Sequence, residues 1–184
     1  MRVSTLLDGQ FDSLPTTRTS LGHGAFVLGY VGEDIDVAVG LMDRSLALNP
    51  SFARGWYWSG VLRLFAGQPD LALEHFQTFL RLSPRDRLAV YLTGIGVALF
   101  FKRQFDDAAA KLLASLEQLP TFALTYRFLA SCYAHTGRLD EARDIVERLR
   151  AITPVVVPSA TPYRNPEHQE LFLSGLRRAA GEAP

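Results

Sequence analysis

Apolar residues recur along most of this chain at intervals of three and four, a spacing that places them on one face of an α-helix. The pattern is clearest between residues 56 and 84. Trp56 and Gly60 stand about one helical turn apart on a first predicted helix, and Gly67 interrupts the run. A second predicted helix carries small and large apolar residues at helical spacing and ends at a proline: Ala72, Phe76, Phe79 and Pro84. We therefore predict two antiparallel helices that cross most closely at the small residues.

The same arrangement recurs along the chain. Prolines close four successive units at spacings of 34, 36 and 34 residues: Pro50, Pro84, Pro120 and Pro154. An alanine early in each second helix keeps the same steps: Ala38, Ala72, Ala108 and Ala142. Glycine occupies the tight turn of the second and fourth units, at Gly67 and Gly137, and Arg103 takes that place in the third. Two antiparallel helices in about 34 residues are the pattern of a tetratricopeptide repeat.

This repeat pattern sets the predicted fold and its boundaries. We expect an all-α fold, a right-handed superhelix of antiparallel helix pairs that stack as a solenoid. The predicted units follow an N-terminal segment, residues 1–18, and cover residues 19–50, 51–84, 85–120 and 121–154. Thr19 or Ser20 is expected to cap a first helix that runs to Tyr30, after a linker at residues 15–17. Two additional residues near 85–88 are expected to lengthen the start of the third unit.

The pattern changes after Pro154. Residues 155–163 contain two prolines and several β-branched residues, so we expect an extended segment there. Asn165 before Pro166 predicts a helix start, and Gly181 predicts the end of that helix. Because the last repeat of a solenoid needs a cover, we predict that residues 155–184 form an extended linker and a capping helix on the open side of the fourth unit.

Composition limits the classes of function. Apolar residues make up 48% and charged residues 21% of the 184, which is typical of a folded domain. Lys plus Arg equals Asp plus Glu at 19 each, so we expect neither nucleic acid nor an anionic membrane as a partner. The longest apolar run, residues 95–101, is too short to span a bilayer. A single cysteine, Cys132, excludes an intrachain disulfide, and we predict a cytoplasmic protein.

No residue set indicates catalysis. The four histidines lack the spacing of metal ligands, and acidic residues gather at helix starts, where the helix dipole favours them. Cys132 and His135 lie about one turn apart and could form a nucleophilic pair, but a small core cysteine is the alternative that we favour. We therefore predict no enzyme activity, no cofactor and no metal.

Three segments resemble the repeat region of bacterial class III adenylate/guanylate cyclase-like proteins: residues 28–56, 82–101 and 163–181. In that family the repeats follow a cyclase catalytic domain or a winged-helix domain. The resemblance implies a regulatory setting in nucleotide-cyclase-like signalling. It transfers no catalytic residue, because the readable segments of this chain are all assigned to repeat helices.

A groove is the best candidate site. In stacked repeats the first helices line the concave side, so residues at fixed steps after each large residue are expected to face it. The predicted protein-binding groove is apolar and aromatic, with one arginine: Tyr57, Val61, Leu64, Phe65, Val97, Phe100, Phe101, Arg127, Ser131 and His135. Thr93 is expected on the same face. Such surfaces are typical of protein interfaces. Alternatively, the N-terminal segment or the C-terminal tail fills the groove.

The sequence therefore favours a non-enzymatic scaffold that binds a protein or peptide. Self-association is a second mode, because the first helix presents Phe26, Val27 and Tyr30 without a preceding repeat to cover them. A homodimer would bury them. Two other classes stay open: a fragment or degenerate relative of an adenylate cyclase, and a small-ligand sensor that uses the aromatic groove.

Overall fold

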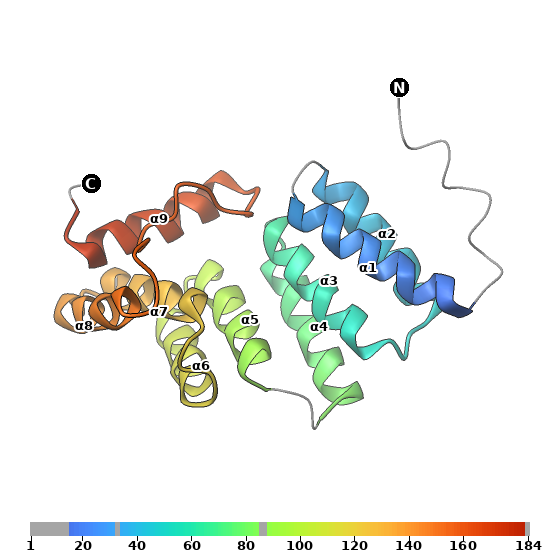
Figure 1. The fold of residues 1–184 in the computed structure, drawn as a ribbon, viewed down its shortest axis with the longest axis horizontal. Coiled ribbons are helices and arrows are strands. Elements are labelled where there is room, and N and C mark those ends of the chain that lie inside the picture. The colour runs from blue at the N-terminus through green and yellow to red at the C-terminus, as the bar shows by residue number, and fades with distance from the viewer. Residues whose placement is uncertain (1–14, 32–33, 85–87, 183–184) are drawn as a thin grey trace.

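The computed structural model describes residues 15–31, 34–84 and 88–182. Within these ranges the chain is all-helical, which confirms the predicted fold class. Helices follow one another as antiparallel neighbours and stack side by side along the molecule (Figure 1). They are α1 (Pro15–Val31), α2 (Ile35–Leu48), α3 (Ala53–Phe65), α4 (Pro69–Leu82), α5 (Leu88–Phe101), α6 (Phe105–Gln118), α7 (Ala123–His135), α8 (Leu139–Arg150) and α9 (Pro166–Ala180).

The tight turns between paired helices confirm the reading of Gly67, Gly137 and Arg103. Gly67 and Gly137 have φ of 78° and 81°, in the left-handed region that glycine enters without a steric penalty. Arg103 holds the same conformation with φ of 60°, although it carries a Cβ. The fold therefore imposes one turn geometry on all three units, whichever residue is present.

The start of α1 differs from the prediction. The helix begins at Pro15 rather than Thr19, so residues 15–17 form its first turn and are not a linker. Proline suits the first position of a helix, because its fixed φ is helical and its missing N–H would have no partner there. Thr19 and Ser20 consequently lie inside α1 and do not cap it. The turn before α2 and the two additional residues near 85–88 fall partly or wholly outside the described residues.

Small residues and one aromatic ring hold the second repeat against the third. Phe76 of α4 is fully buried. A Cβ added to Gly60 of α3 would come within 2.5 Å of its ring, and one added to Gly94 of α5 within 2.7 Å. Two successive first helices therefore approach the same ring from either side through their glycines. The alanines that begin the second helices, at positions 38, 72, 108 and 142, are also fully buried, as their spacing predicts.

Three buried hydroxyl groups join α5, α6 and α7. Thr93 Oγ1 lies 2.8 Å from Ser115 Oγ and 2.8 Å from Thr125 Oγ1. Ser115 Oγ in turn donates to the carbonyl of Ala89 at 2.7 Å. Thr93 is only 2% exposed, so the expectation that it faces the groove was wrong. Its hydroxyl is used inside the core, where a polar group needs a partner.

The C-terminal segment confirms the expected cap signals. Residues 155–165 are neither helix nor strand. The Asn165 side chain then accepts from the N–H groups of Glu167 and His168, and α9 ends at Gly181 with φ of 76°. Helix α9 packs on α7 and also contacts α8 (Figure 1). Because α7 is the first helix of its pair, α9 covers the inner side of the fourth unit as well as its end.

Candidate protein-binding surface

The residues of the predicted groove divide into two sets in the structure. Six are buried: Leu64, Phe65, Val97, Phe100, Phe101 and Ser131. Four are half-buried: Tyr57, Val61, Arg127 and His135. Tyr57 lies against the rings of Phe76 and Phe79, and burial raises the pKa of its hydroxyl to about 12. Most of the predicted groove residues are therefore shielded from solvent. The segment after Pro154 provides part of that shielding.

Residues 155–164, which we call the groove loop, lie along α7, α5 and α3. Arg127 of α7 donates from Nε to the carbonyl of Val156 at 3.0 Å and from a terminal nitrogen to that of Val155 at 2.7 Å. Burial lowers the pKa of this guanidinium. At the other end of the loop, the N–H of Arg164 donates to the carbonyl of Phe65 at 2.7 Å. The alternative that the C-terminal tail fills the groove thus agrees with these contacts.

An aromatic box holds the groove loop between these two ends. Tyr163 is 3% exposed, and burial raises the pKa of its hydroxyl strongly. Its ring lies 4.8 Å from that of Phe101 and 5.9 Å from those of Phe65 and Phe128, centroid to centroid. Phe172 of α9 adds a fourth ring at 6.0 Å. The box therefore combines three first helices with α9.

Helix α9 covers two more of the predicted groove residues, Ser131 and His135. Ser131 Oγ donates to the carbonyl of Phe172 at 3.1 Å, and His135 Nε2 lies 2.7 Å from that of Leu171. A carbonyl only accepts, so this contact assigns the proton to Nε2. Burial lowers the pKa of His135, whose ring stacks on Phe105. His135 thus positions α9 as a neutral donor.

The comparisons with known proteins agree with this architecture. Two family models described as tetratricopeptide repeat match the chain, over residues 30–87 and residues 100–156. Together the matches cover more than half of its length. The chain belongs to the tetratricopeptide-repeat family. No curated protein sequence matches it.

Several solved structures share this tetratricopeptide-repeat fold. A crystal structure of MamA superposes with a TM-score of 0.60 at 19% identity, covering 87% of this chain and 92% of that chain. YrrB, described as a TPR protein with an unusual peptide-binding site, gives 0.58 at 21% identity, covering 94% and 87%. The APC/C hetero-tetramer Cut9–Hcn1 gives 0.67 at 21% identity, covering 89% of this chain and 29% of that chain. At these identities the similarity shows the fold alone, and none of the three is described as cyclase-like.

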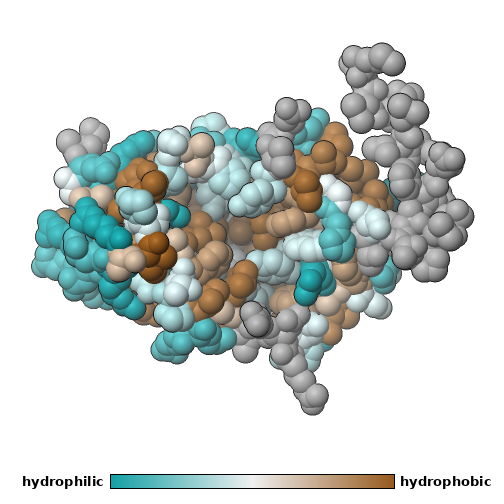
Figure 2. All heavy atoms as spheres, in the orientation of Figure 1, coloured by the Kyte–Doolittle hydropathy of each residue, from teal (hydrophilic) through white to brown (hydrophobic). Residues whose placement is uncertain are grey.

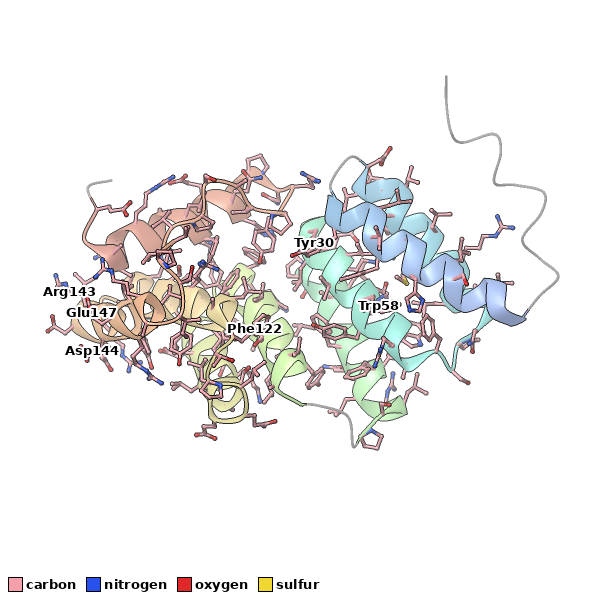
Figure 3. All side chains as sticks on the ribbon, viewed as in Figure 1. Tyr30, Trp58, Phe122, Arg143, Asp144 and Glu147 are labelled. Atoms are coloured by element: carbon pink, nitrogen blue, oxygen red, sulfur yellow. The ribbon has the colours of Figure 1, made fainter. Side chains whose placement is uncertain are left out.

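The two ends of this tetratricopeptide-repeat array differ in polarity. Large apolar side chains are at least half exposed on α1 and at the start of α2: Val27 at 58%, Leu28 at 50%, Tyr30 at 66% and Val37 at 50%. Figure 2 shows apolar residues gathered at this end, on the right, and a largely hydrophilic surface at the opposite end. There α8 displays Arg143, Asp144 and Glu147 (Figure 3). We call Val27, Leu28 and Val37 the N-terminal apolar patch; Tyr30 lies apart from them, with its ring 6.2 Å from that of Phe65.

One of the three α1 residues that were expected to be uncovered packs inside the protein. Phe26 is half-buried, and its ring stacks on that of Trp58 of α3 at 5.4 Å. Tyr30 stays largely exposed at the end of α1 nearer the C-terminal half of the chain (Figure 3). Trp58 lies near the middle of α3, away from that end. Of the three residues expected to be uncovered on α1, Val27 and Tyr30 are thus exposed and Phe26 is not.

The structure gives little support to a nucleophilic role for Cys132. Cys132 is 1% exposed, and burial raises the pKa of its thiol to about 12, which disfavours the reactive thiolate. Among the described residues, no group of three His, Cys, Asp or Glu side chains could hold a metal ion. Within the same part of the chain, no helix is long and apolar enough to cross a membrane.

Tyr163 was not identified from the sequence as a residue of the groove. Tyr163 follows Pro162 in a segment that lacks helical periodicity, so no spacing assigned it to a surface. A signal was present nonetheless. Residues 154–163 contain no charged side chain, and an exposed linker would not need to be so apolar. That composition could have indicated a segment packed against the groove.

Proposed function

We propose that this tetratricopeptide-repeat protein is a non-enzymatic scaffold that binds other protein chains and associates with itself through the N-terminal apolar patch. One observation carries the self-association: Val27, Leu28 and Val37 are exposed to 50% or more at one end of the array. A solenoid normally ends in polar surface, because an open apolar face is unfavourable in water. Helix α8 displays Arg143, Asp144 and Glu147 at the opposite end, whereas the α1 end exposes the apolar side chains of the patch.

A second copy is an occupant that suits this patch. The chain has no formal net charge, so two identical faces meet without a large long-range repulsion. A twofold arrangement would place α1 against α1 and bury the same side chains of both copies. The patch is small beside the roughly 1,200–2,000 Å² of a stable interface, so further surface of α1 and α2 has to contribute.

The test is the mass of the protein in solution, by light scattering after gel filtration over a range of concentrations. We expect a species of about twice 20.4 kDa that dissociates on dilution. Val27→Glu combined with Leu28→Glu should give a monomer, because each charge would be buried at the interface. Leu113→Glu is a matched control, because this apolar side chain is 41% exposed on α6, away from both α1 and the groove loop. A wild-type protein that stays monomeric at its highest attainable concentration would remove the dimer from the proposal.

A regulatory role beside nucleotide-cyclase-like proteins is a finer proposal that rests on the resemblance of residues 28–56, 82–101 and 163–181 alone. Incubation with ATP or GTP and a divalent metal separates a scaffold from a cyclase relative, and we expect no cyclic nucleotide. A small-ligand sensor gains no support from the groove, because Tyr163 fills its aromatic box.

A further inference from the structure

The groove loop sits where an extended segment of another protein would bind. Its two ends are fastened, at Arg127 and at the carbonyl of Phe65, whereas Ser159 and Ala160 between them are exposed. The surface beneath is formed by α3, α5 and α7, and it presents an arginine fork at one end and an aromatic box at the other. We propose that the groove loop is a built-in ligand, and that a partner protein binds the same groove through an extended segment that displaces it.

The contacts of the loop describe the chemistry of that partner. Tyr163 places an aromatic ring among four others, three of which belong to the first helices. The fourth, Phe172, lies on α9, which is held independently by its stacking on Phe128 at 4.3 Å. The box therefore persists when only the loop lifts away. An incoming segment needs an aromatic side chain at the position of Tyr163, because aromatic pairs at these distances are favourable beyond the area they bury.

Arg127 gives a partner an advantage over the loop. Within the part of the chain that the structure describes, its guanidinium has two carbonyl partners and no ion pair with a carboxylate. The side chain is half-buried, and burial lowers the pKa of the guanidinium. A carboxylate forms a stronger, charge-assisted hydrogen bond with arginine than a carbonyl does. The favoured ligand is thus an extended segment with an acidic residue about eight positions before an aromatic one.

The intact chain restrains binding from outside. The loop is tethered at both ends, by α8 and α9, so it competes at a high effective concentration. A partner segment without the acidic residue makes no stronger contact with Arg127 than the loop does. A segment with that residue makes a stronger contact and can displace the loop. This inference rests on the proposed protein-binding function but uses α3, α5 and α7, so it can fail while self-association through the N-terminal apolar patch holds.

Fluorescence anisotropy on the full chain tests the proposal, with a labelled peptide of residues 153–164 as the probe. Tyr163→Ala in the protein weakens the loop, and it should lower the Kd for the wild-type peptide at least about tenfold. Val156→Ala, at a side chain that is 9% exposed, should act in the same direction. Val155→Ala is the matched control, because the Val155 side chain is 51% exposed and only its backbone carbonyl contacts Arg127.

Two further arms identify the ligand chemistry in the Tyr163→Ala protein. A peptide carrying Val155→Asp should bind more tightly than the wild-type peptide, and Arg127→Ala in the protein should abolish that gain. Circular dichroism and thermal melting confirm that each variant is folded. Equal peptide affinities for wild type, Tyr163→Ala and Val156→Ala would overturn the proposal. So would a dimer formed by exchange of residues 155–180 between two Tyr163→Ala copies, because the occupant would then be this chain itself.

Discussion

Replacing Thr93 by valine tests whether the buried hydroxyl network holds α5, α6 and α7 together. Ser115 donates to the carbonyl of Ala89, so the Thr93 proton is directed at Ser115 Oγ and at that same carbonyl, which lies 3.3 Å away. With its own proton used in this way, Thr93 accepts from Thr125. Valine has nearly the shape of threonine, so the change creates no cavity. The change removes the middle hydroxyl of the hydrogen-bond network. The Thr125 hydroxyl, which is fully buried, has then lost its acceptor.

The expected loss of folding stability follows from the lost hydrogen bond. A buried polar group that loses its partner costs about 1–3 kcal/mol. For a chain of this size each kcal/mol lowers the melting temperature by roughly 2–4 °C, so Thr93→Val should lower it by about 2–12 °C. Calorimetry and urea denaturation measure the two quantities independently.

A double variant separates the hydrogen-bond network from the loss of single hydroxyl groups. Thr93→Val with Thr125→Val removes both hydroxyls, while Ser115 keeps its bond to Ala89. Its cost should therefore be smaller than the sum of the two single changes. Thr136→Val is the control, because that hydroxyl lies at an exposed residue and contacts only carbonyls of its own helix. A Thr93→Val protein within about 0.5 kcal/mol of wild type, or strictly additive costs, would refute the network.

Three other predictions concern Arg103, Cys132 and a set of three histidines. Arg103→Gly should raise the free energy of unfolding by about 1 kcal/mol in urea denaturation, because glycine holds φ of 60° without strain, and a loss of stability would contradict that assignment. Cys132 should not react with a thiol reagent until the protein is denatured, and a fast reaction in buffer would show that α7 is open. Burial lowers the pKa of three histidines, so the folded state binds fewer protons than the unfolded state, and the free energy of unfolding should fall as pH drops through about 6.5. These residues are His75, His135 and His168. Replacing all three by glutamine should flatten that dependence in denaturation curves at several pH values, and an unchanged slope would exclude them.

The sequence predicted the repeat core because that core obeys one period. Ala72 and Phe76 recur in phase with their counterparts, and a ring clamped between Gly60 and Gly94 needs those residue sizes at those positions. The turn at Arg103 was also predictable, although arginine carries no signal for positive φ, because the other units fixed its place.

The occupancy of the groove could not be predicted in the same way. Residues 155–164 have no periodicity, and their partners lie on three helices that are distant in the sequence. The periodicity of α5 likewise placed Thr93 on the groove side, because a pattern of apolar positions does not show where a hydroxyl finds its hydrogen bonds. The binding of an external partner at Tyr57, Val61 or Arg127 stays a prediction.

Nuclear Overhauser effects between aromatic rings test whether residues 155–164 occupy the groove of their own chain. The centroids of Tyr163 and Phe101 are 4.8 Å apart, so their ring protons should give cross-peaks in the wild-type protein at pH 7. The pair Phe128 and Phe172, at 4.3 Å, serves as the internal reference for α9. We predict cross-peaks for both pairs. A cross-peak for the reference pair without one between Tyr163 and Phe101 would show that the groove is open and that the loop does not occupy it.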